Sequence, residues 1–176
     1  MRPLSTSLAL ILTLLAIWAP ASADDRVYQT PEQFLSEAFG AQAPRQAVLW
    51  LTRPIQTDLN TILGHAPAQL RQRYWTDGQK TAWILEEIGK EEPITAGFVV
   101  GPDGRIQMSR VLIYREPRGM EVRYPAFLKQ FTGAGLAPNR FLDRNIDGIS
   151  GATLSVRAMQ KMARAALYMN RLARHS

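Results

Sequence analysis

A short stretch in the last quarter of the chain carries the residues best suited to chemistry. It reads Asp147-Gly148-Ile149-Ser150-Gly151-Ala152-Thr153, so a threonine hydroxyl follows a small and flexible turn. An amphipathic helix is predicted directly after it, over residues 154–174. The free N–H groups and the dipole at the start of a helix both favour negative charge. A phosphate ester on the Thr153 hydroxyl would therefore be stabilised where it forms.

The same residues also permit a purely structural interpretation. The two glycines could form an ordinary turn, with Ser150 or Thr153 acting as the N-cap of the last helix, a position that serine and threonine favour. Asp147 could likewise head the turn through its own side chain. From these residues alone, both interpretations stay open.

The stretch resembles the flavinylation motif of the FMN-binding domain family, known from subunits of the sodium-translocating NADH:quinone reductase and of Rnf complexes. In that family a flavin transferase joins FMN, through its phosphate, to the last residue of an Asp-x-x-Ser/Thr-Gly-Ala-Ser/Thr pattern. The resemblance implies covalent FMN on Thr153. It also implies that Ser150, Gly151 and Ala152 form the acceptor turn and that Asp147 serves the metal-assisted transfer.

A second segment, Tyr114-Arg115-Glu116-Pro117-Arg118-Gly119-Met120, resembles the loop of the same family that contains Glu, Pro and Gly. Arg118 separates Pro117 from Gly119, so the match is partial. The resemblance implies that the loop lies over the isoalloxazine ring, where Glu116 and Gly119 shape its surroundings and its reduction potential. The alternative is a polar turn with Glu116 paired to a surface arginine. Nearby aromatic residues that could stack on the ring are Tyr114, Tyr124, Phe127 and Phe131. Phe127 and Phe131 are four residues apart and share a helix face, most of which is expected to be core.

Composition excludes several other kinds of redox protein. The chain has no cysteine, which rules out disulfides, thiolate metal sites, iron–sulfur clusters and attached c-type haem. Its two histidines, His65 and His175, do not suggest a metal site. Since no catalytic triad or nucleotide-binding loop is present, no catalytic residue is assigned. We expect an electron carrier rather than an independent enzyme.

The N-terminus has the features of a secretory signal peptide. Arg2 precedes the apolar run Leu8–Ala19, and Ala21-Ser22-Ala23 offers a cleavage site before Asp24. The alternative is an uncleaved membrane anchor, but the run is short of the roughly 20 apolar residues that a span needs. We therefore predict an exported, periplasmic protein.

The formal net charge is +6, and several positive charges fall on the predicted last helix. They form either a solvated face or a docking surface for an acidic partner or anionic lipid headgroups. An exported chain without a recognised nucleic-acid motif is not expected to bind nucleic acid. The basic residues in question are Arg157, Lys161, Arg164, Arg171 and Arg174.

The remaining elements predict an α+β fold: one domain with a twisted antiparallel sheet and a C-terminal amphipathic helix. Thr30-Pro31 should start a helix that ends at Gly40. Turn residues at 77–78 and 101–104 predict two hairpins. Expected strands are 47–51, 71–75, 81–87, 94–100 and 105–114, with a short helix at 57–63. Residues 1–23 would be the signal peptide, 24–90 an N-terminal extension with helix and strands, and 91–176 the FMN-binding domain.

Two apolar faces follow from the spacing. In the strand at 105–114, alternation places Ile106, Met108, Arg110, Leu112 and Tyr114 on one side. On the last helix, a core face is expected from residues three or four apart. Its members are Leu154, Ala158, Met162, Ala165 or Ala166, Met169 and Leu172.

The combined prediction is an exported flavoprotein that carries FMN covalently on Thr153. It would relay electrons between a membrane-bound redox partner and an extracytoplasmic acceptor, after loading by a flavin transferase. The competing hypothesis is an exported binding or adaptor module that holds FMN non-covalently, or another small anionic ligand, and transfers no electrons.

Overall fold

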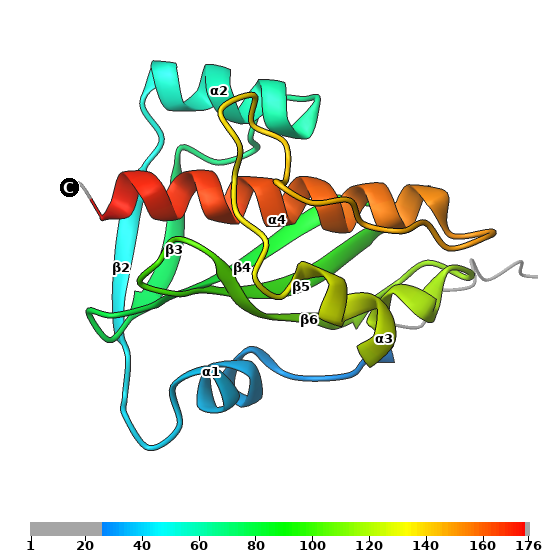
Figure 1. The fold of residues 1–176 in the computed structure, drawn as a ribbon, viewed down its shortest axis with the longest axis horizontal. Helices are drawn as coiled ribbons and strands as arrows, with labels where there is room; N and C mark the ends of the chain where they lie inside the picture. Colours follow the sequence, from blue (N-terminus) through cyan, green and yellow to red (C-terminus); the bar gives the residue numbers. More distant parts are fainter. Residues whose placement is uncertain (1–25, 175–176) are drawn as a thin grey trace, which may run out of the picture.

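A long C-terminal helix, α4 (Thr153–Ala173), lies across one face of a six-stranded antiparallel sheet (Figure 1). This computed structural model describes residues 26–174, so the predicted signal peptide and His175 lie outside the described residues. The arrangement confirms the predicted α+β class with a C-terminal helix. Among residues 26–174, no helix combines the length and the apolar character that crossing a membrane requires.

The strand order is β1-β6-β5-β4-β3-β2, and every neighbouring pair is antiparallel. β4 pairs with β5 along its whole length, from Thr81↔Val100 to Ile88↔Pro93. The sheet therefore runs without a break across residue 90, where the sequence placed the end of the N-terminal extension. The strands are β1 (Arg26–Val27), β2 (Arg45–Trp50), β3 (Arg71–Thr76), β4 (Thr81–Ile88), β5 (Pro93–Val100) and β6 (Ile106–Tyr114).

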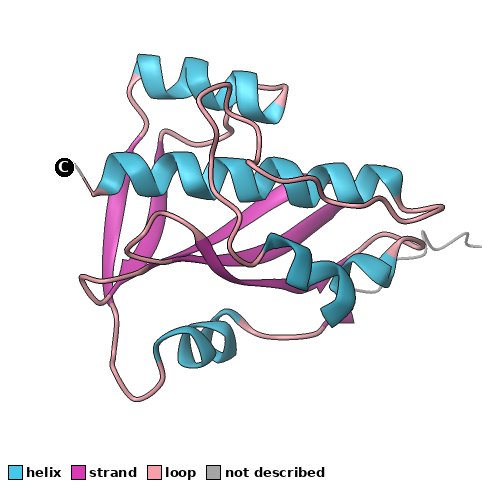
Figure 2. Cartoon of the chain, in the orientation of Figure 1, coloured by secondary structure: helices cyan, strands magenta, loops and turns pink. Residues whose placement is uncertain are grey.

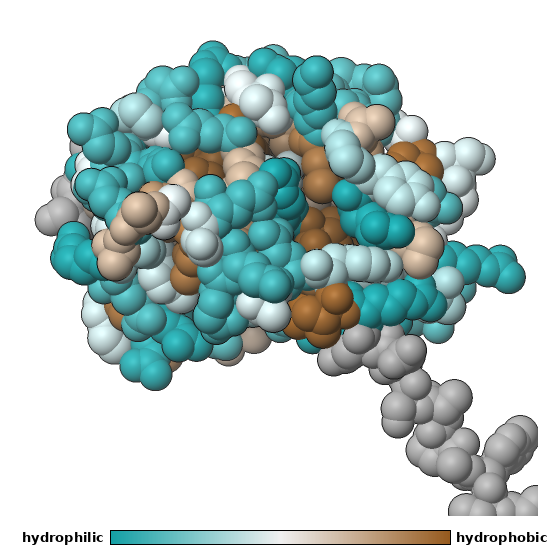
Figure 3. All heavy atoms as spheres, turned by 90° about the horizontal axis from the view of Figure 1, so that it is seen from below, coloured by the Kyte–Doolittle hydropathy of each residue, from teal (hydrophilic) through white to brown (hydrophobic). Residues whose placement is uncertain are grey.

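Helices cover both faces of the sheet (Figure 2). On one side lies α1 (Pro31–Phe39), which starts at a capping box in which Thr30 and Gln33 bond reciprocally. Its buried Phe34 packs on Val99 and Leu112. The surface on the α1 side of the molecule is mostly hydrophilic (Figure 3). On the other side, α2 (Arg53–Leu63) packs beside α4. The short segments η1 (Met120–Arg123), α3 (Pro125–Leu128) and η2 (Lys129–Phe131) follow β6.

The main core lies between the sheet and α4. Trp83, fully buried, stacks on Tyr74 with ring centroids 4.7 Å apart. The expected face of the last helix needs one correction, because Leu154 is 41% exposed whereas Ser155 and Val156 are buried. Ser155 points inward because its hydroxyl bonds to buried Tyr114, and this turns Leu154 toward solvent.

The expected alternation along β6 is also wrong. The pairing of β6 with β5 shifts register twice, so that Gln107 and Leu112 have no single partner on β5. Each such bulge reverses which side the following residues face. As a result Ile106 and Tyr114 belong to the core under α4, whereas Leu112 and Met108 pack on the side of α1.

Candidate functional site

The residues before α4 form a tight and open turn. The Ala152 N–H donates to the Ile149 carbonyl at 3.0 Å, with Ser150 and Gly151 between them. Gly151 has φ +79°, as the third position of a type II turn requires, which is why a glycine is suited to that place. Ser150 and Gly151 are exposed, and a Cβ added to Gly148 or Gly151 would meet nothing within 4 Å. Another protein can therefore reach the turn.

Thr153 is the first residue of α4, and its side chain is exposed. The N-cap is Ala152, and within the described residues no side chain caps this end and no acidic residue lies in the first turn. The interpretation of Ser150 or Thr153 as a helix cap is therefore wrong. The first-turn N–H groups and the helix dipole remain available to an anion at this point.

Asp147 lies exposed upstream of the turn. Its backbone N–H donates to Gln130 Oε1 at 2.7 Å, and its carboxylate accepts from the Asn145 side chain at 3.1 Å. The bond to Gln130 ties the motif to the segment that follows β6. Sequence reasoning did not find this contact of Gln130, because nothing in the neighbouring residues indicates a side chain that accepts from a distant backbone N–H.

Gly119 brings the second predicted segment against the first. Its φ is +86°, and a Cβ built there would lie 2.8 Å from Tyr114 Oη, 2.9 Å from Ser155 Oγ and 3.3 Å from Ala152 Cβ. A glycine is needed for both reasons, since it tolerates this φ and permits the close approach. The loop at 115–119 and the start of α4 are therefore in direct contact, as a shared site requires.

Glu116 is 2% exposed and does not form the surface ion pair considered above. Its Oε1 accepts the backbone N–H groups of Lys90, Glu91 at 2.7 Å and Glu92 at 3.1 Å. Such charge-assisted bonds compensate the burial of a carboxylate. Glu116 therefore anchors the loop to the turn between β4 and β5.

Three of the four aromatic residues expected near a ring lie in the core. Tyr114 is fully buried: its Oη donates to the Arg118 carbonyl at 2.5 Å and lies 2.9 Å from Ser155 Oγ. Burial raises the pKa of the Tyr114 phenol, which keeps it protonated. Phe127 and Phe131 are also buried and meet edge to face at 5.5 Å. Tyr124 alone of the four is exposed, at 43%, and the Arg123 guanidinium lies 4.9 Å from its ring centroid.

The comparison with protein families supports a cofactor class. Residues 89–168 match the family model of the FMN-binding domain. This stretch contains the loop with Glu116 and Gly119, the turn at residues 149–152 and most of α4, and the match supports a flavin-binding protein with FMN as its cofactor. Neither the curated proteins nor the solved structures contain a match to the chain.

The residues present fit FMN at the start of α4. The exposed Thr153 hydroxyl and the uncapped first turn suit its phosphate. Leu154, which the sequence placed in the core, instead offers an exposed apolar side chain beside Thr153. A hollow of about 530 Å³ lies farther along α4, between residues 141–146 and the helix, where Gln160 and Arg164 line it. Within residues 26–174, no group of acidic or histidine side chains could hold a metal.

The basic side chains of α4 mostly hold the protein's own loops. Lys161 pairs with buried Glu87 at 2.9 Å, and Arg164 donates to the Arg140 carbonyl at 2.6 Å. Arg171 donates to the Leu136 carbonyl at 3.2 Å, and Arg174 to the Gly101 carbonyl at 3.2 Å. These contacts give most of the positive charge on α4 an intramolecular function.

Proposed function

We propose that this protein is an exported flavoprotein that carries FMN as a phosphoester on Thr153. It relays electrons between a membrane-bound donor and an extracytoplasmic acceptor. The observation that carries the proposal is the position of Thr153: exposed, at the end of an open Ser-Gly-Ala turn, and first in an uncapped helix of 21 residues. The match of residues 89–168 to the FMN-binding domain supports it.

Attachment requires a flavin transferase and an FMN donor activated on its phosphate. The Thr153 hydroxyl oxygen attacks the phosphorus, a new P–O bond forms, and the bond to the donor's leaving group breaks. The hydroxyl proton passes to a base of the transferase. The chain thus gains the mass of one FMN less one water. The first-turn N–H groups of α4 then stabilise the charge of the ester.

The neighbouring hydroxyls are less suited to this step. Ser155 is 5% exposed, and its hydroxyl is engaged with Tyr114. Ser150 is exposed but lies within the turn, before the helix begins, so an ester there would be farther from the first-turn N–H groups. Thr153 alone of the three combines exposure with the first helical position.

Bound FMN supplies the electron-transfer chemistry, and the surrounding residues set its environment. Exposed Leu154 offers an apolar contact next to the attachment point. Gly119 lets the loop backbone approach the same place, and Glu116 fixes that loop from behind. We propose that these three residues tune the spectrum and reduction potential without forming the covalent bond.

Intact mass of protein expressed with a flavin transferase tests the attachment. Wild type should carry one FMN less one water, and Thr153→Ala should lose both this mass and in-gel flavin fluorescence. Thr153→Ser keeps the hydroxyl and should still be loaded, while Ser150→Ala should only reduce loading. Covalent flavin retained on Thr153→Ala would contradict the assignment. N-terminal sequencing of the exported protein should begin at Asp24.

The second candidate is a non-redox module that holds FMN, or another small anion, reversibly. It is favoured by the uncapped start of α4, which attracts an anion whether or not an ester forms. Denaturation and desalting separate the two functions, because covalent flavin stays with the polypeptide and reversibly bound flavin is removed.

A further inference from the structure

The β2–β3 hairpin leaves the main sheet as a two-stranded ribbon. β2 and β3 pair at six positions, from Arg45↔Thr76 to Trp50↔Arg71. β3 pairs with β4 only at Trp75↔Ala82 and Thr76↔Thr81. The end of the ribbon that carries Trp50 and Arg71 is therefore the end farther from β4.

The two faces of this ribbon differ sharply. Leu49 is buried in the core under α4, and Tyr74 stacks on Trp83. Residues directly opposite one another share a face, so Trp50 and Val48 lie on the outer face with Arg71 and Arg73. Trp50 is 64% exposed and Val48 39%, and both arginines are exposed.

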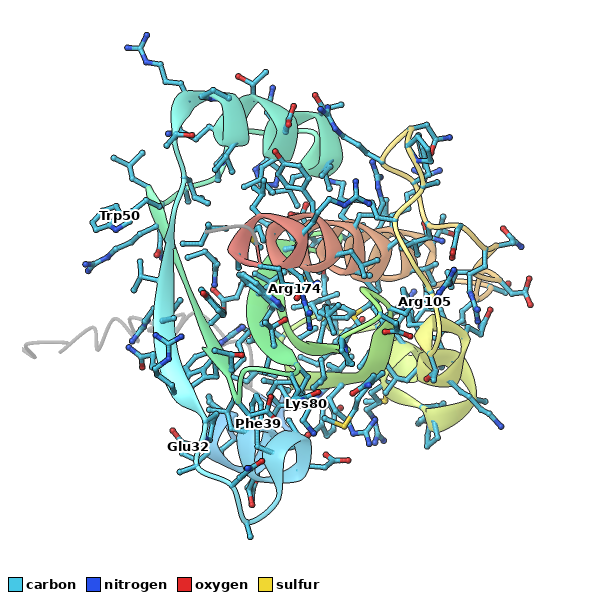
Figure 4. The ribbon with its side chains drawn as sticks, turned by 60° about the vertical axis from the view of Figure 1, so that its left-hand side comes forward. Glu32, Phe39, Trp50, Lys80, Arg105 and Arg174 are labelled. Atoms are coloured by element: carbon cyan, nitrogen blue, oxygen red, sulfur yellow. The ribbon has the colours of Figure 1, made fainter. Side chains whose placement is uncertain are left out.

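A second large apolar side chain lies beside Trp50 at the end of the ribbon. Leu70 is 66% exposed, and its carbonyl accepts the Leu51 N–H at 2.9 Å, which fixes it next to the end of β2. Exposed Arg53 begins α2 just beyond. Trp50 points away from the body of the molecule (Figure 4). The tip is thus an apolar projection with arginines around it.

The charge of the ribbon and of the segment that joins its two strands is mainly positive. Residues 45–73 contain four arginines and a single acidic residue, Asp58. Asp58 pairs with Arg140 at 2.5 Å and accepts the Tyr168 hydroxyl at 2.6 Å, so its charge is already compensated. Arg53, Arg71 and Arg73 therefore present uncompensated positive charge around Trp50 and Leu70.

We propose that this ribbon tip, formed by Trp50, Leu70, Arg53, Arg71 and Arg73, docks on an anionic lipid surface. Tryptophan favours the interface between lipid and water, where its ring is amphipathic. Apolar side chains that enter the interface add to the attraction of arginines for anionic headgroups. Two side chains that project from a corner suit a deformable lipid layer, whereas a protein partner would need a matching hollow.

The proposal also implies which end of α4 lies nearer the lipid surface. Figure 1 shows β2 and β3 near the C-terminal end of α4, whereas the acceptor turn lies at its N-terminal end. A helix of 21 residues is about 30 Å long at 1.5 Å per residue. Docking through the ribbon tip therefore places the contact at the opposite end of α4 from Thr153, which stays accessible to a transferase and a redox partner.

Vesicle flotation with the purified exported protein tests the docking. Wild type should float with vesicles of phosphatidylcholine and phosphatidylglycerol but not with phosphatidylcholine alone, and added salt should reduce the binding. Trp50→Ser with Leu70→Ser should abolish flotation. Each of Arg71→Ala and Arg73→Ala should weaken it about fivefold, as expected for one basic residue near an anionic surface.

Matched controls separate the tip from general surface effects. Ile88→Ser removes an apolar side chain that is 57% exposed elsewhere, and Arg157→Ala removes an exposed arginine of α4; both should float like wild type. All variants share one N-terminus, and their thermal unfolding should match that of wild type. Thr153→Ala should also float normally, which distinguishes failure of this proposal from failure of the flavin assignment.

Three results would overturn the docking proposal. The first is wild-type protein that binds no vesicles or binds neutral and anionic vesicles equally. The second is undiminished flotation of the Trp50→Ser, Leu70→Ser variant. The third is a dimer in analytical ultracentrifugation that this double variant dissociates, which would assign the tip to a second copy of the chain.

Discussion

Tyr114 Oη lies 2.9 Å from Ser155 Oγ, and this contact joins the end of β6 to the first turn of α4. The phenol donates to the Arg118 carbonyl, so the Ser155 hydroxyl is the donor between the two side chains. One buried hydroxyl therefore fixes the strand, the loop and the helix start relative to one another. The position of the turn at residues 149–152 therefore depends on a residue outside the motif.

Replacing Tyr114 with Phe should loosen this junction. The ring would still fill the core, but the Arg118 carbonyl and the Ser155 hydroxyl would lose their partner, at a cost of about 1–3 kcal/mol in the free energy of unfolding. Loading of Thr153 should also become slower. Urea unfolding and a time course of intact mass measure the two effects. Ser155→Ala, which removes one bond, should show a smaller effect; unchanged stability and loading in both variants would refute the role of the junction.

Gly119→Ala should separate the loop from the helix. A Cβ at this position would lie within 3 Å of both Tyr114 Oη and Ser155 Oγ, and φ is +86°. We expect a loss of about 1–3 kcal/mol in stability together with a changed flavin spectrum. Gly104→Ala is the matched control, because it has φ +72° with nothing within 4 Å. Equal effects of the two variants would mean that backbone strain alone is responsible.

Glu116→Gln should release the loop from the turn between β4 and β5. The variant keeps the shape of the side chain but loses the charge that its three N–H donors stabilise. Charge-assisted bonds of this kind contribute about 1.5–3 kcal/mol. Hydrogen exchange at residues 90–92 should accelerate, and the reduction potential should shift. Exposed Glu121→Gln provides the comparison, and equal exchange in the two variants would argue against the anchor.

His65 should make stability depend on pH. Both ring nitrogens face acceptors: Nδ1 lies 3.0 Å from the Ala66 carbonyl and Nε2 2.9 Å from Glu87 Oε2. The hydrogen bond to the Ala66 carbonyl is the larger cause, and the one to Glu87 the second, of a pKa of His65 that is raised above its ordinary 6.5. Folding favours the protonated form of His65. Its contribution to the free energy of unfolding is therefore complete below pH 6.5 and is lost as the pH rises through the higher pKa of the folded state.

Melting temperatures in a buffer series should show this dependence. The melting temperature of wild type should exceed that of His65→Asn most at acidic pH. The difference should vanish at alkaline pH, where the imidazole is neutral in both the folded and the unfolded state. A constant difference across the series would mean that His65 acts through packing rather than through its charge.

The sequence predicted most of the elements, though not β1 or the first turn of α2, and it did not predict their detailed faces. Turn residues at 77–78 and 101–104 predicted the β3–β4 and β5–β6 hairpins correctly, and capping signals predicted α1, because these features depend on local chemistry. The bulges in β6 left no local signal, since they arise from the way that β6 fits β5. The prediction that Leu154 is buried was wrong for a similar reason, because the hydrogen bond between Ser155 and Tyr114 orients the first turn of α4.

The candidate site shows the same division. The motif could be located from residue types and spacing, and the contact of Gly119 with Ala152 agrees with a shared site. The hydrogen-bond partners of Glu116 could not be predicted, because they are the backbone N–H groups of residues 90–92, which residue types do not distinguish from other backbone N–H groups. Burial of Phe127 and Phe131 agrees with the expectation that their shared face is mostly core, whereas Tyr114 is a stacking candidate that fills the core instead, because residue type alone does not distinguish the two positions.

The position of α4 after all six strands along the chain makes its packing a late step of folding. Twelve of its residues are buried, and they include Met159 and Met162, which are almost completely enclosed. Until these residues pack on the sheet, one face of the sheet stays bare, and the chain cannot reach its cooperative folded state. The turn at 150–153 takes its final shape in that same last step. An enzyme that recognises this shape would act on finished molecules and pass over truncated ones.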